Sequence, residues 1–415
     1  MSLRSSRAAA VALVTLATFT DIVAYSIAIP VLPDLSRRLG ASPTMIGLLF
    51  GAFGVTLLTV SMPMGAFSDR IGRKVPMVGG LAALAVASVF FAIGDRLWWL
   101  FAARLVQGAA DAVTWVVGFA LVADLYDADE RGRVTGIVMS GTTVAVMLGP
   151  TFGGWLYEAG GTRLPFMMVA VLAALVAGGF IWLDVPRERA PRDIVPIREV
   201  LRTRSILVCA VVVVAASATI SMLEPVLALH LGALGIRPGR IGTVFGAGAM
   251  VSAVMHPVFG RLADRLGARR MTLCGLVAMA VNVVLLSQTW SFASTVVLFC
   301  FAAAGAALVI TPSLTFMGEA TSEAGIGSFG VAYGIYNMAW GAGLLCGPSI
   351  GGFVYERSSF PALALGWAPV LLIITGLLAT VNTARPRQPV VNQSSLNSVR
   401  IGAASDDSRT AGKNP

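Results

Sequence analysis

The stretch GAFSDRIGRK at residues 65–74 returns as GRLADRLGAR at residues 260–269, 195 residues further along the chain. A second pair has nearly the same offset, since LGPTFGGWLYE at 148–158 matches CGPSIGGFVYE at 346–356. Two motifs that recur in the same order at one spacing indicate that a structural unit has been duplicated. The sequence therefore predicts two halves of the same topology, which run in the same direction.

The composition places this duplicated unit in a lipid bilayer. Hydrophobic residues make up 56% of the 415 residues and charged residues only 12%, and the mean hydropathy is strongly positive. A membrane-spanning helix needs about 20 mostly apolar residues. We therefore expect an all-α integral membrane protein with twelve transmembrane helices in two pseudo-symmetric halves of six. The expected spans lie near residues 9–32, 44–66, 75–94, 98–124, 134–157, 164–184, 205–231, 240–262, 271–289, 292–317, 327–350 and 362–382.

The chain divides accordingly. We expect an N-terminal six-helix half at 1–184 and a C-terminal six-helix half at 205–384. The segment 185–204 is rich in arginine and proline and is predicted to be a basic cytoplasmic linker. Residues 385–415, which are rich in Ser, Asn, Asp and Gly, are predicted to form a disordered cytoplasmic tail.

Basic residues are shared unevenly between the two sets of loops. The formal charge is +9, and of the 30 Lys and Arg residues 22 fall on the side that carries the N-terminus, 7 fall on the other, and Arg104 lies inside a span. This bias follows the positive-inside rule. We therefore expect a multi-pass protein of the cell inner (plasma) membrane with both termini cytoplasmic. Charge that serves orientation in the bilayer makes a nucleic-acid partner improbable.

Two six-helix halves joined by a basic linker resemble the major facilitator superfamily over about residues 8–384. The loop motif resembles that family's signature between helices 2 and 3, complete in the first half and partial in the second. An aspartate there can cap a helix or pair with an arginine, and the resemblance implies that Asp69 and Arg73 control gating. The alternative is that these charges only orient the protein. The motif residues are Gly65, Asp69, Arg70, Gly72, Arg73, Lys74, Gly260, Asp264, Arg265 and Gly267.

Polar residues recur along one face of the predicted fourth span. Arg104, Gln107, Gly108 and Asp111 are spaced by three, four and seven residues, which places them on one side of a helix. A charged face in lipid is expected to look inward. RLVQG at 104–108 resembles the family's helix-4 motif, which implies that Arg104, with Gln107, takes part in proton coupling. Alternatively, Arg104 only binds backbone carbonyls or a neighbouring acid.

The fifth span is rich in glycine and carries a proline. Small residues four apart let helices approach closely, and a proline bends a span. The pattern resembles the signature of antiporters in the superfamily and returns in the eleventh span, so the resemblance implies antiport. Packing by itself would also explain the glycines. The residues concerned are Gly149, Pro150, Gly153, Gly154, Gly347, Pro348, Gly351 and Gly352.

Three acids lie inside predicted spans. Asp21, Asp111 and Glu224 each cost of the order of 3 kcal/mol to insert, so each is a functional candidate by default. Asp21 shares a helix face with Tyr25, and Glu224 shares one with two serines. We expect both faces to line a central cavity, where a proton and an organic cation compete for one carboxylate. The alternative is that each acid pairs permanently with a neighbour.

The eleventh span carries an aromatic stripe. Tyr333, Tyr336, Asn337 and Trp340 lie at spacings of three, four and seven residues. Aromatic faces attract organic cations and also hold flat apolar molecules. We predict that the stripe binds substrate, although core packing explains it equally well.

Several segments resemble the vesicular amine transporter branch of the drug:proton antiporters. TDIVAYSIAIPVLP at 20–33 and MLEPVLALH at 222–230 carry the resemblance. It implies that Asp21 is the amine-binding aspartate and Glu224 the helix-7 glutamate. The family's helix-2 lysine position is taken by Phe53, and two of its aspartates fall at or near Ile310 and Asn337. These departures favour a bacterial-type multidrug or metabolite exporter over a neurotransmitter carrier.

Enzyme chemistry finds no support in the sequence. The two histidines, His230 and His256, are far apart without metal-binding spacing, and no phosphate-binding GxxxxGK[ST] loop is present. We therefore predict no enzyme, no metal site and no cofactor.

The prediction is a monomeric, proton-coupled antiporter that exports a small organic solute, of cationic or amphiphilic, drug-like character, by alternating access. Two alternatives stay open. In the first alternative, the chain exports a neutral sugar, amino acid or other metabolite, or imports it in symport with protons. It could instead be a membrane sensor that uses a transporter fold.

Overall fold

The fold is entirely helical in the part of the chain that the computed structural model describes, which is residues 7–184, 203–289, 291–323 and 329–380. The predicted linker at 185–204 lies almost wholly outside the described residues, and the predicted tail at 385–415 lies outside them entirely. Residues 7–380 belong to one compact unit. The boundaries predicted for the two halves stay predictions.

The first half begins with a broken helix. The expected span 9–32 corresponds to α1, the short turn η2 and α2, because Pro30 and Pro33 interrupt regular helical hydrogen bonding near residues 27–32. Long helices follow from there. The elements are α1 (Arg7–Ser26), η2 (Ile29–Val31), α2 (Leu32–Leu39), α3 (Pro43–Ile71), α4 (Lys74–Ile93), α5 (Leu97–Leu125), α6 (Ala128–Gly160) and α7 (Arg163–Trp182).

The second half repeats this order. Its helices are α9 (Arg204–Ala233), α10 (Pro238–Leu266), α11 (Ala268–Ser287), α12 (Phe292–Glu323), α13 (Phe329–Arg357) and α14 (Phe360–Thr380). Eleven spans of the described chain are long and apolar enough to cross a membrane. The helix that is not among these eleven, α13, is 29 residues long and occupies the place expected for the span 327–350.

The two halves pair their helices in the same way. In the first half α1 packs on α6, α3 on α5, and α4 on α7, and in the second half α9 packs on α13, α10 on α12, and α11 on α14. Matching details follow. Lys74 at the start of α4 donates to the carbonyl of Leu183 at 2.8 Å, and Arg269 in α11 donates to that of Leu378 at 2.7 Å. The duplication read from the sequence is therefore present in three dimensions.

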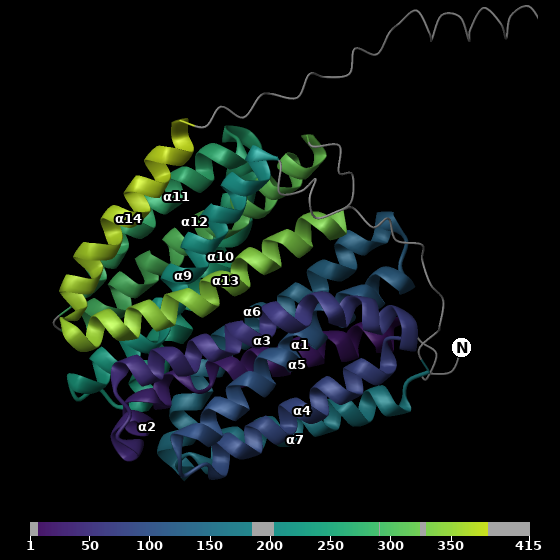
Figure 1. Cartoon of the computed structure of the whole chain (residues 1–415), viewed down its shortest axis with the longest axis horizontal. Coiled ribbons are helices and arrows are strands. Elements are labelled where there is room, and N and C mark those ends of the chain that lie inside the picture. Colours follow the sequence, from purple (N-terminus) through teal and green to yellow (C-terminus); the bar gives the residue numbers. More distant parts are fainter. Residues whose placement is uncertain (1–6, 185–202, 290, 324–328, 381–415) are drawn as a thin grey trace, which may run out of the picture. The chain divides into compact units, whose positions relative to one another are not determined.

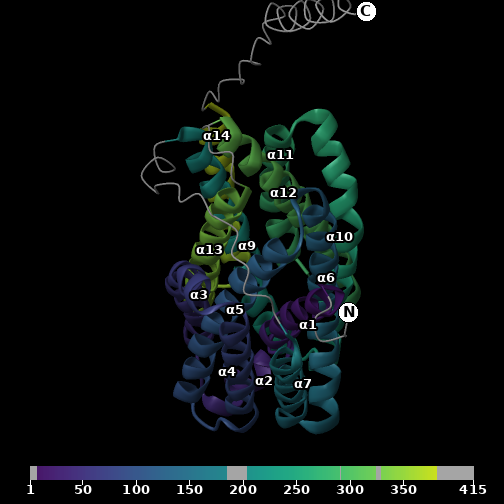
Figure 2. The same ribbon diagram turned by 90° about the vertical axis from the view of Figure 1, so that its right-hand side faces the viewer.

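The halves, at lower right and upper left in Figure 1, meet through α3 against α13 and α6 against α10, which Figure 2 shows on opposite sides of the molecule. The contact is tight where α3 and α10 begin. A Cβ atom added at Gly352 would lie 2.4 Å from the carbonyl oxygen of Pro43, and one added at Gly154 would lie 2.3 Å from that of Pro238. We call this the closed end.

The opposite end is different. Gly136 and Gly334 each lie 18 residues, or five turns, before Gly154 and Gly352, so they lie on the same faces of α6 and α13. A Cβ atom at either position would meet nothing within 4 Å. The halves therefore separate toward the end that carries the repeated Gly72 and Gly267 loops, which we call the open end. Figure 2 views the same helices after a 90° turn.

Candidate functional site

Two carboxyl groups from neighbouring helices meet inside the first half. Asp21 of α1 is 2% exposed and Asp111 of α5 is 7% exposed, and their side chains are in hydrogen-bonding contact. The Thr114 hydroxyl donates to Asp21 Oδ2 at 3.2 Å, and the Trp115 side chain lies close to both acids. Two carboxyl groups can share a hydrogen bond only when a proton lies between them. The pair is therefore a ready-made proton-binding site.

One helical turn further along α1, a hydrogen bond joins the two halves. The Tyr25 hydroxyl donates to Glu224 Oε2 of α9 at 2.6 Å, across 199 residues of sequence. Both side chains are half-buried. Since the donor belongs to the first half and the acceptor to the second, any motion that separates the halves at this depth must break the bond.

Arg104 of α5 is fully buried beside this link. Its guanidinium carbon lies 4.1 Å from the ring centroid of Phe50 and 5.2 Å from those of Tyr25 and Phe91. Nη1 donates to Gln107 Oε1 at 3.2 Å and to the Tyr25 carbonyl at 3.5 Å. Ring faces attract a desolvated cation by about 2 kcal/mol or more. Aromatic side chains rather than a carboxylate therefore hold this charge.

Two buried donors of the cluster remain unused. Within the described part of the chain, Arg104 Nε and Gln107 Nε2 have no hydrogen-bond partner. Arg104 and Glu224 are near enough to attract each other electrostatically, but the described salt bridges do not include them. A ligand with an acceptor atom could satisfy these donors.

The charges of the cluster do not balance. Three acids, Asp21, Asp111 and Glu224, face one guanidinium, that of Arg104. Charge in a water-poor interior has to be compensated by protons or by opposite charge. The cluster can therefore bind protons or an organic cation, and it can exchange a bound cation for protons.

The aromatic stripe of α13 makes its described contacts elsewhere. The rings of Tyr336 and Trp340 are stacked with centroids 6.4 Å apart, and the Tyr336 hydroxyl lies 3.2 Å from the Ser313 hydroxyl of α12. Asn337 is half-buried, and the side chain of Tyr333 lies outside the described residues. A substrate-binding role for the stripe stays a prediction.

The two serines expected to line a cavity with Glu224 face α13 instead. The Ser217 hydroxyl donates to the carbonyl of Trp340 at 3.1 Å and the Ser221 hydroxyl to that of Gly343 at 3.2 Å. Both serines are buried. They bind α9 to α13, so only Glu224 of that predicted polar stripe reaches across to the first half.

At the open end, Arg73 organises the repeated loop. It pairs with Asp69 at 2.6 Å and with Asp124 of α5 at 2.7 Å. Burial alone would lower the pKa of Arg73, but the hydrogen bonds and charges of Asp124 and Asp69 outweigh that effect and raise it. The equivalent glycines Gly72 and Gly267 have φ of +91° and +93°, a conformation that favours glycine. The motif residues thus shape both loops alike.

The glycines of α6 and α13 serve close packing. A Cβ at Gly149 would lie 2.1 Å from the Ser26 hydroxyl of α1, and one at Gly153 would lie 2.5 Å from the Ile27 carbonyl. In the second half, a Cβ at Gly347 would lie 2.2 Å from the Ala218 carbonyl of α9, and one at Gly351 would lie 2.3 Å from Met222. Pro150 and Pro348 present their carbonyls to α10 and α3. Both motif copies therefore hold helices in backbone contact.

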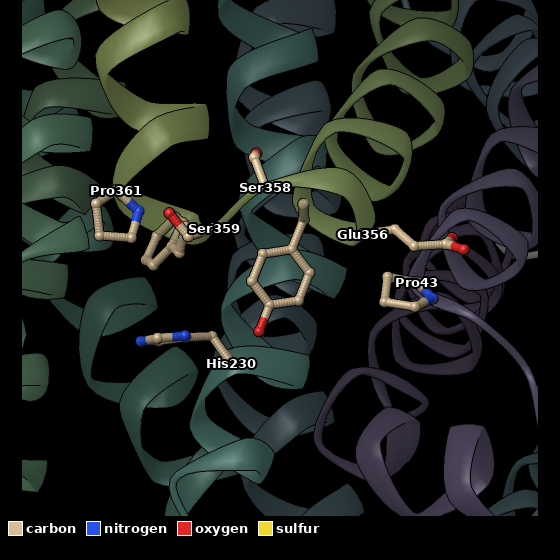
Figure 3. A pocket seen from close by; sticks show the side chains of 8 residues that line it. Pro43, His230, Glu356, Ser358, Ser359 and Pro361 are labelled. Carbon is tan, nitrogen blue, oxygen red and sulfur yellow. The ribbon is translucent and has the colours of Figure 1, made fainter.

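A pocket of about 370 Å³ with a mixed polar and apolar lining lies at the closed end, apart from the acid cluster. Its walls come from the ends of α9 and α13 and the starts of α3 and α14. Figure 3 shows Pro43 beside Glu356, with His230 on the far side of the pocket. Solvent can therefore reach the contact between α3 and α13 at this edge of the closed end.

Comparison with known proteins identifies the fold family. The sequence profile of the Major Facilitator Superfamily matches residues 14–232 and 209–405. The chain belongs to the major facilitator superfamily. Its twelve-helix, two-half architecture, predicted from the repeats, is confirmed, and this superfamily member is a multi-pass membrane protein.

Relatives within the superfamily include vesicular transporters of amines and of acetylcholine. The synaptic vesicular amine transporter of Rattus norvegicus is 27% identical over 335 residues, which cover 80% of this chain and 65% of the relative. The vesicular acetylcholine transporter of Rattus norvegicus is 29% identical over 363 residues, which cover 82% and 68%. The chain therefore spans slightly less than two thirds of the amine transporter. The resemblance to this branch is confirmed.

Solved structures of the superfamily show the same fold. A bacterial homologue of the human lysosomal transporter Spinster, in an inward-facing and occupied conformation, has a TM-score of 0.76 at 16% identity, with 91% of this chain and 95% of the other covered. The human organic anion transporter MFSD10 (TETRAN) has a TM-score of 0.66 at 19% identity, with 89% and 99% covered. At these identities the likeness concerns the fold alone.

The structure brings together six of the polar residues that the sequence singled out inside the spans, from both halves of this superfamily member. Asp21, Tyr25, Arg104, Gln107, Asp111 and Glu224 form one cluster. Sequence reasoning missed Phe50 and Phe91, which no motif marks. It also missed Thr114 and Trp115, although their positions three and four residues after Asp111 place them beside it on the helix.

Proposed function

We propose that this transporter is an antiporter that exports an organic cation or cationic amphiphile in exchange for protons. The imbalance of three carboxyl groups, two of them buried and that of Glu224 half-buried, against the one buried guanidinium of Arg104 carries the proposal. Known relatives carry amines and acetylcholine, which are ammonium compounds at neutral pH. The carboxyl groups of the cluster support the same class of substrate here, with a small molecule and protons as the two transported partners.

Exchange follows from competition for the same carboxylates. A cation that binds Glu224 and Tyr25 compensates the negative charge that a proton would otherwise remove. A proton delivered to Glu224 or to the Asp21–Asp111 pair expels the cation. One pH unit across the membrane then supplies about 1.4 kcal/mol for each proton exchanged.

The direction of transport rests on the charge of the loops. The basic loops lie at the open end, and the positive-inside rule assigns that end to the cytoplasm. We therefore infer an inward-facing state that loads substrate from the cytoplasm, in a plasma-membrane protein with both termini inside that works as a monomer. Asp69 and Arg73 lie at the open end, and we infer that they control gating between this state and the outward-facing one.

The test is proton movement in liposomes. The purified full chain is reconstituted with a pH-sensitive dye inside, and a series of quaternary and protonatable organic cations is added. We expect substrate-triggered proton movement in the wild type and none in Glu224→Gln. Asp95→Asn, which removes an exposed carboxylate outside the cluster, is the matched control and should behave as wild type.

Other outcomes decide between the remaining functions. Absence of proton movement with every cation contradicts the proposal and favours a carrier of a neutral metabolite. Substrate binding without any flux would favour a sensor. Normal coupled transport in Glu224→Gln would remove that residue from the mechanism.

A further inference from the structure

The two helices that begin at the closed end start in the same unusual way. Pro43 and Pro238 occupy the first helical positions of α3 and α10. A proline has no backbone N–H, so the first amide that needs a partner belongs to the next residue. These amides are the N–H groups of Thr44 and Gly239.

Each of these amides is bound by a glutamate from the opposite half. Thr44 N–H donates to Glu356 Oε2 of α13 at 2.9 Å, and Gly239 N–H donates to Glu158 Oε1 of α6 at 2.9 Å. A carboxylate at a helix start also meets the positive end of the helix dipole. The two hydrogen bonds therefore link the halves twice, in equivalent places.

The glycine contacts set the reach of both glutamates. Glu158 and Glu356 follow Gly154 and Gly352 by four residues, so each glutamate lies one turn beyond a backbone-to-backbone contact on the same helix face. Only a helix held at this distance can place the carboxylate on the neighbouring N-terminus. Contact and hydrogen bond form and break together.

We propose that Glu158 and Glu356 are a matched pair of positioning residues that hold the closed end shut. The proposal rests on the alternating access of the proposed function, because both bonds must break when the halves separate at this end. Both glutamates lie at the closed end, apart from the acid cluster.

The two links are not equally replaceable. At α3 the Ser42 side chain also caps the helix, because its hydroxyl accepts from Met45 N–H at 3.4 Å. At α10 the N-cap residue is Arg237, which makes no such side-chain bond. Glu158 is thus the main cap of α10, and its loss should shift the equilibrium more than loss of Glu356.

The experiment measures the distance across the closed end. Spin labels are attached to Leu164→Cys and Leu234→Cys. Leu164 lies at the start of α7 in the first half, Leu234 directly follows the end of α9 in the second half, and both side chains are exposed. The partly or fully exposed cysteines Cys274, Cys300 and Cys346 are first replaced by serine. Distance distributions are recorded in lipid nanodiscs without substrate.

Each single change, Glu158→Gln or Glu356→Gln, should raise the ratio of long to short distances about two- to fivefold. The double variant should approach the product of the two factors, because the links are separate. Glu158→Asp and Glu356→Asp keep the charge but shorten the side chain, so they should resemble the glutamine variants. Asp95→Asn removes an exposed carboxylate in the 94–96 loop and should leave the ratio unchanged.

An unchanged ratio in the double glutamine variant would overturn the proposal, as would an equal change in Asp95→Asn. The readout needs neither substrate nor protons. A shift in distances without any cation-driven proton movement would therefore support the links while contradicting the proposed function.

Discussion

The contact between Asp21 and Asp111 favours a proton bound between the two carboxyl groups. Thr114 and Trp115 fix the two carboxyl groups from the side, so neither can turn away freely. Replacing one acid by its amide keeps a donor between them but removes the exchangeable proton. Stability and coupling can therefore be separated at this pair.

The change Asp21→Asn should leave the unfolding temperature unchanged or raise it, and should abolish proton-coupled transport. The physical reason is that the amide supplies the hydrogen bond without the cost of a second buried acid. Thermal unfolding in detergent and flux in liposomes measure the two effects. A clear loss of thermal stability with intact coupling would contradict this account.

The change Arg104→Lys should impair both folding and transport. An ammonium cannot lie flat on the rings of Phe50 and Phe91 or bind Gln107 and the Tyr25 carbonyl at once. We expect the free energy of unfolding to fall by about 2 kcal/mol, the value of a desolvated cation–ring contact. Denaturant titration checks the magnitude, and Arg96→Lys in an exposed loop is the matched control.

At the scale of helices, the glycines of the repeated motif decide how near the halves can come. A methyl group at Gly154 or Gly352 would collide with backbone atoms of α10 or α3. Backbone cannot move aside as a side-chain tip can, so the whole helix must shift.

Gly154→Ala and Gly352→Ala should each destabilise the closed end by about 1–3 kcal/mol. Spin-label distances across that end should lengthen, and the rate of exchange should fall. Gly178→Ala is the matched control, because a Cβ there meets nothing within 4 Å. Equal behaviour of all three variants would show that the collision is relieved without moving the helices.

Most of the helices could be predicted from the sequence, because hydropathy marks long apolar segments and helix-breaking residues mark their ends. Residues 65–74 and their repeat predicted the two halves correctly. The break after α1 was missed, since Pro30 and Pro33 lie in an apolar run that reads as a single span. The partners of Ser217 and Ser221 could not be read from spacing, since periodicity gives a shared face and not the helix that the face meets.

At the scale of the whole transporter, contact at one end and separation at the other define a single conformational state. Phe50 and Ile46 of the first half share a hydrophobic core with Met222 and Val226 of the second. These four residues lie toward the closed end, near the start of α3 and the end of α9. Their contact depends on the conformation, which a sequence pattern does not show.

Accessibility should follow this asymmetry. Gly136→Cys and Gly334→Cys should react with a membrane-impermeant thiol reagent added to the face that carries the Asp69 loop. Ser349→Cys, which packs against Gly51 at the closed end, should be protected. Mass spectrometry of the labelled protein gives the extent of reaction. Equal labelling of Gly334→Cys and Ser349→Cys would contradict the open and closed assignment.

The reciprocal capping of α3 and α10 also reflects the duplication of the six-helix unit. In each copy of the duplicated unit, a glutamate at the end of one helix binds the first amide of a proline-led helix in the other copy. Such a contact is self-complementary, which is the defining property of an isologous dimer interface. Two separate six-helix units, each with one such glutamate and one such proline, would therefore be able to form the same two hydrogen bonds with each other across a twofold axis.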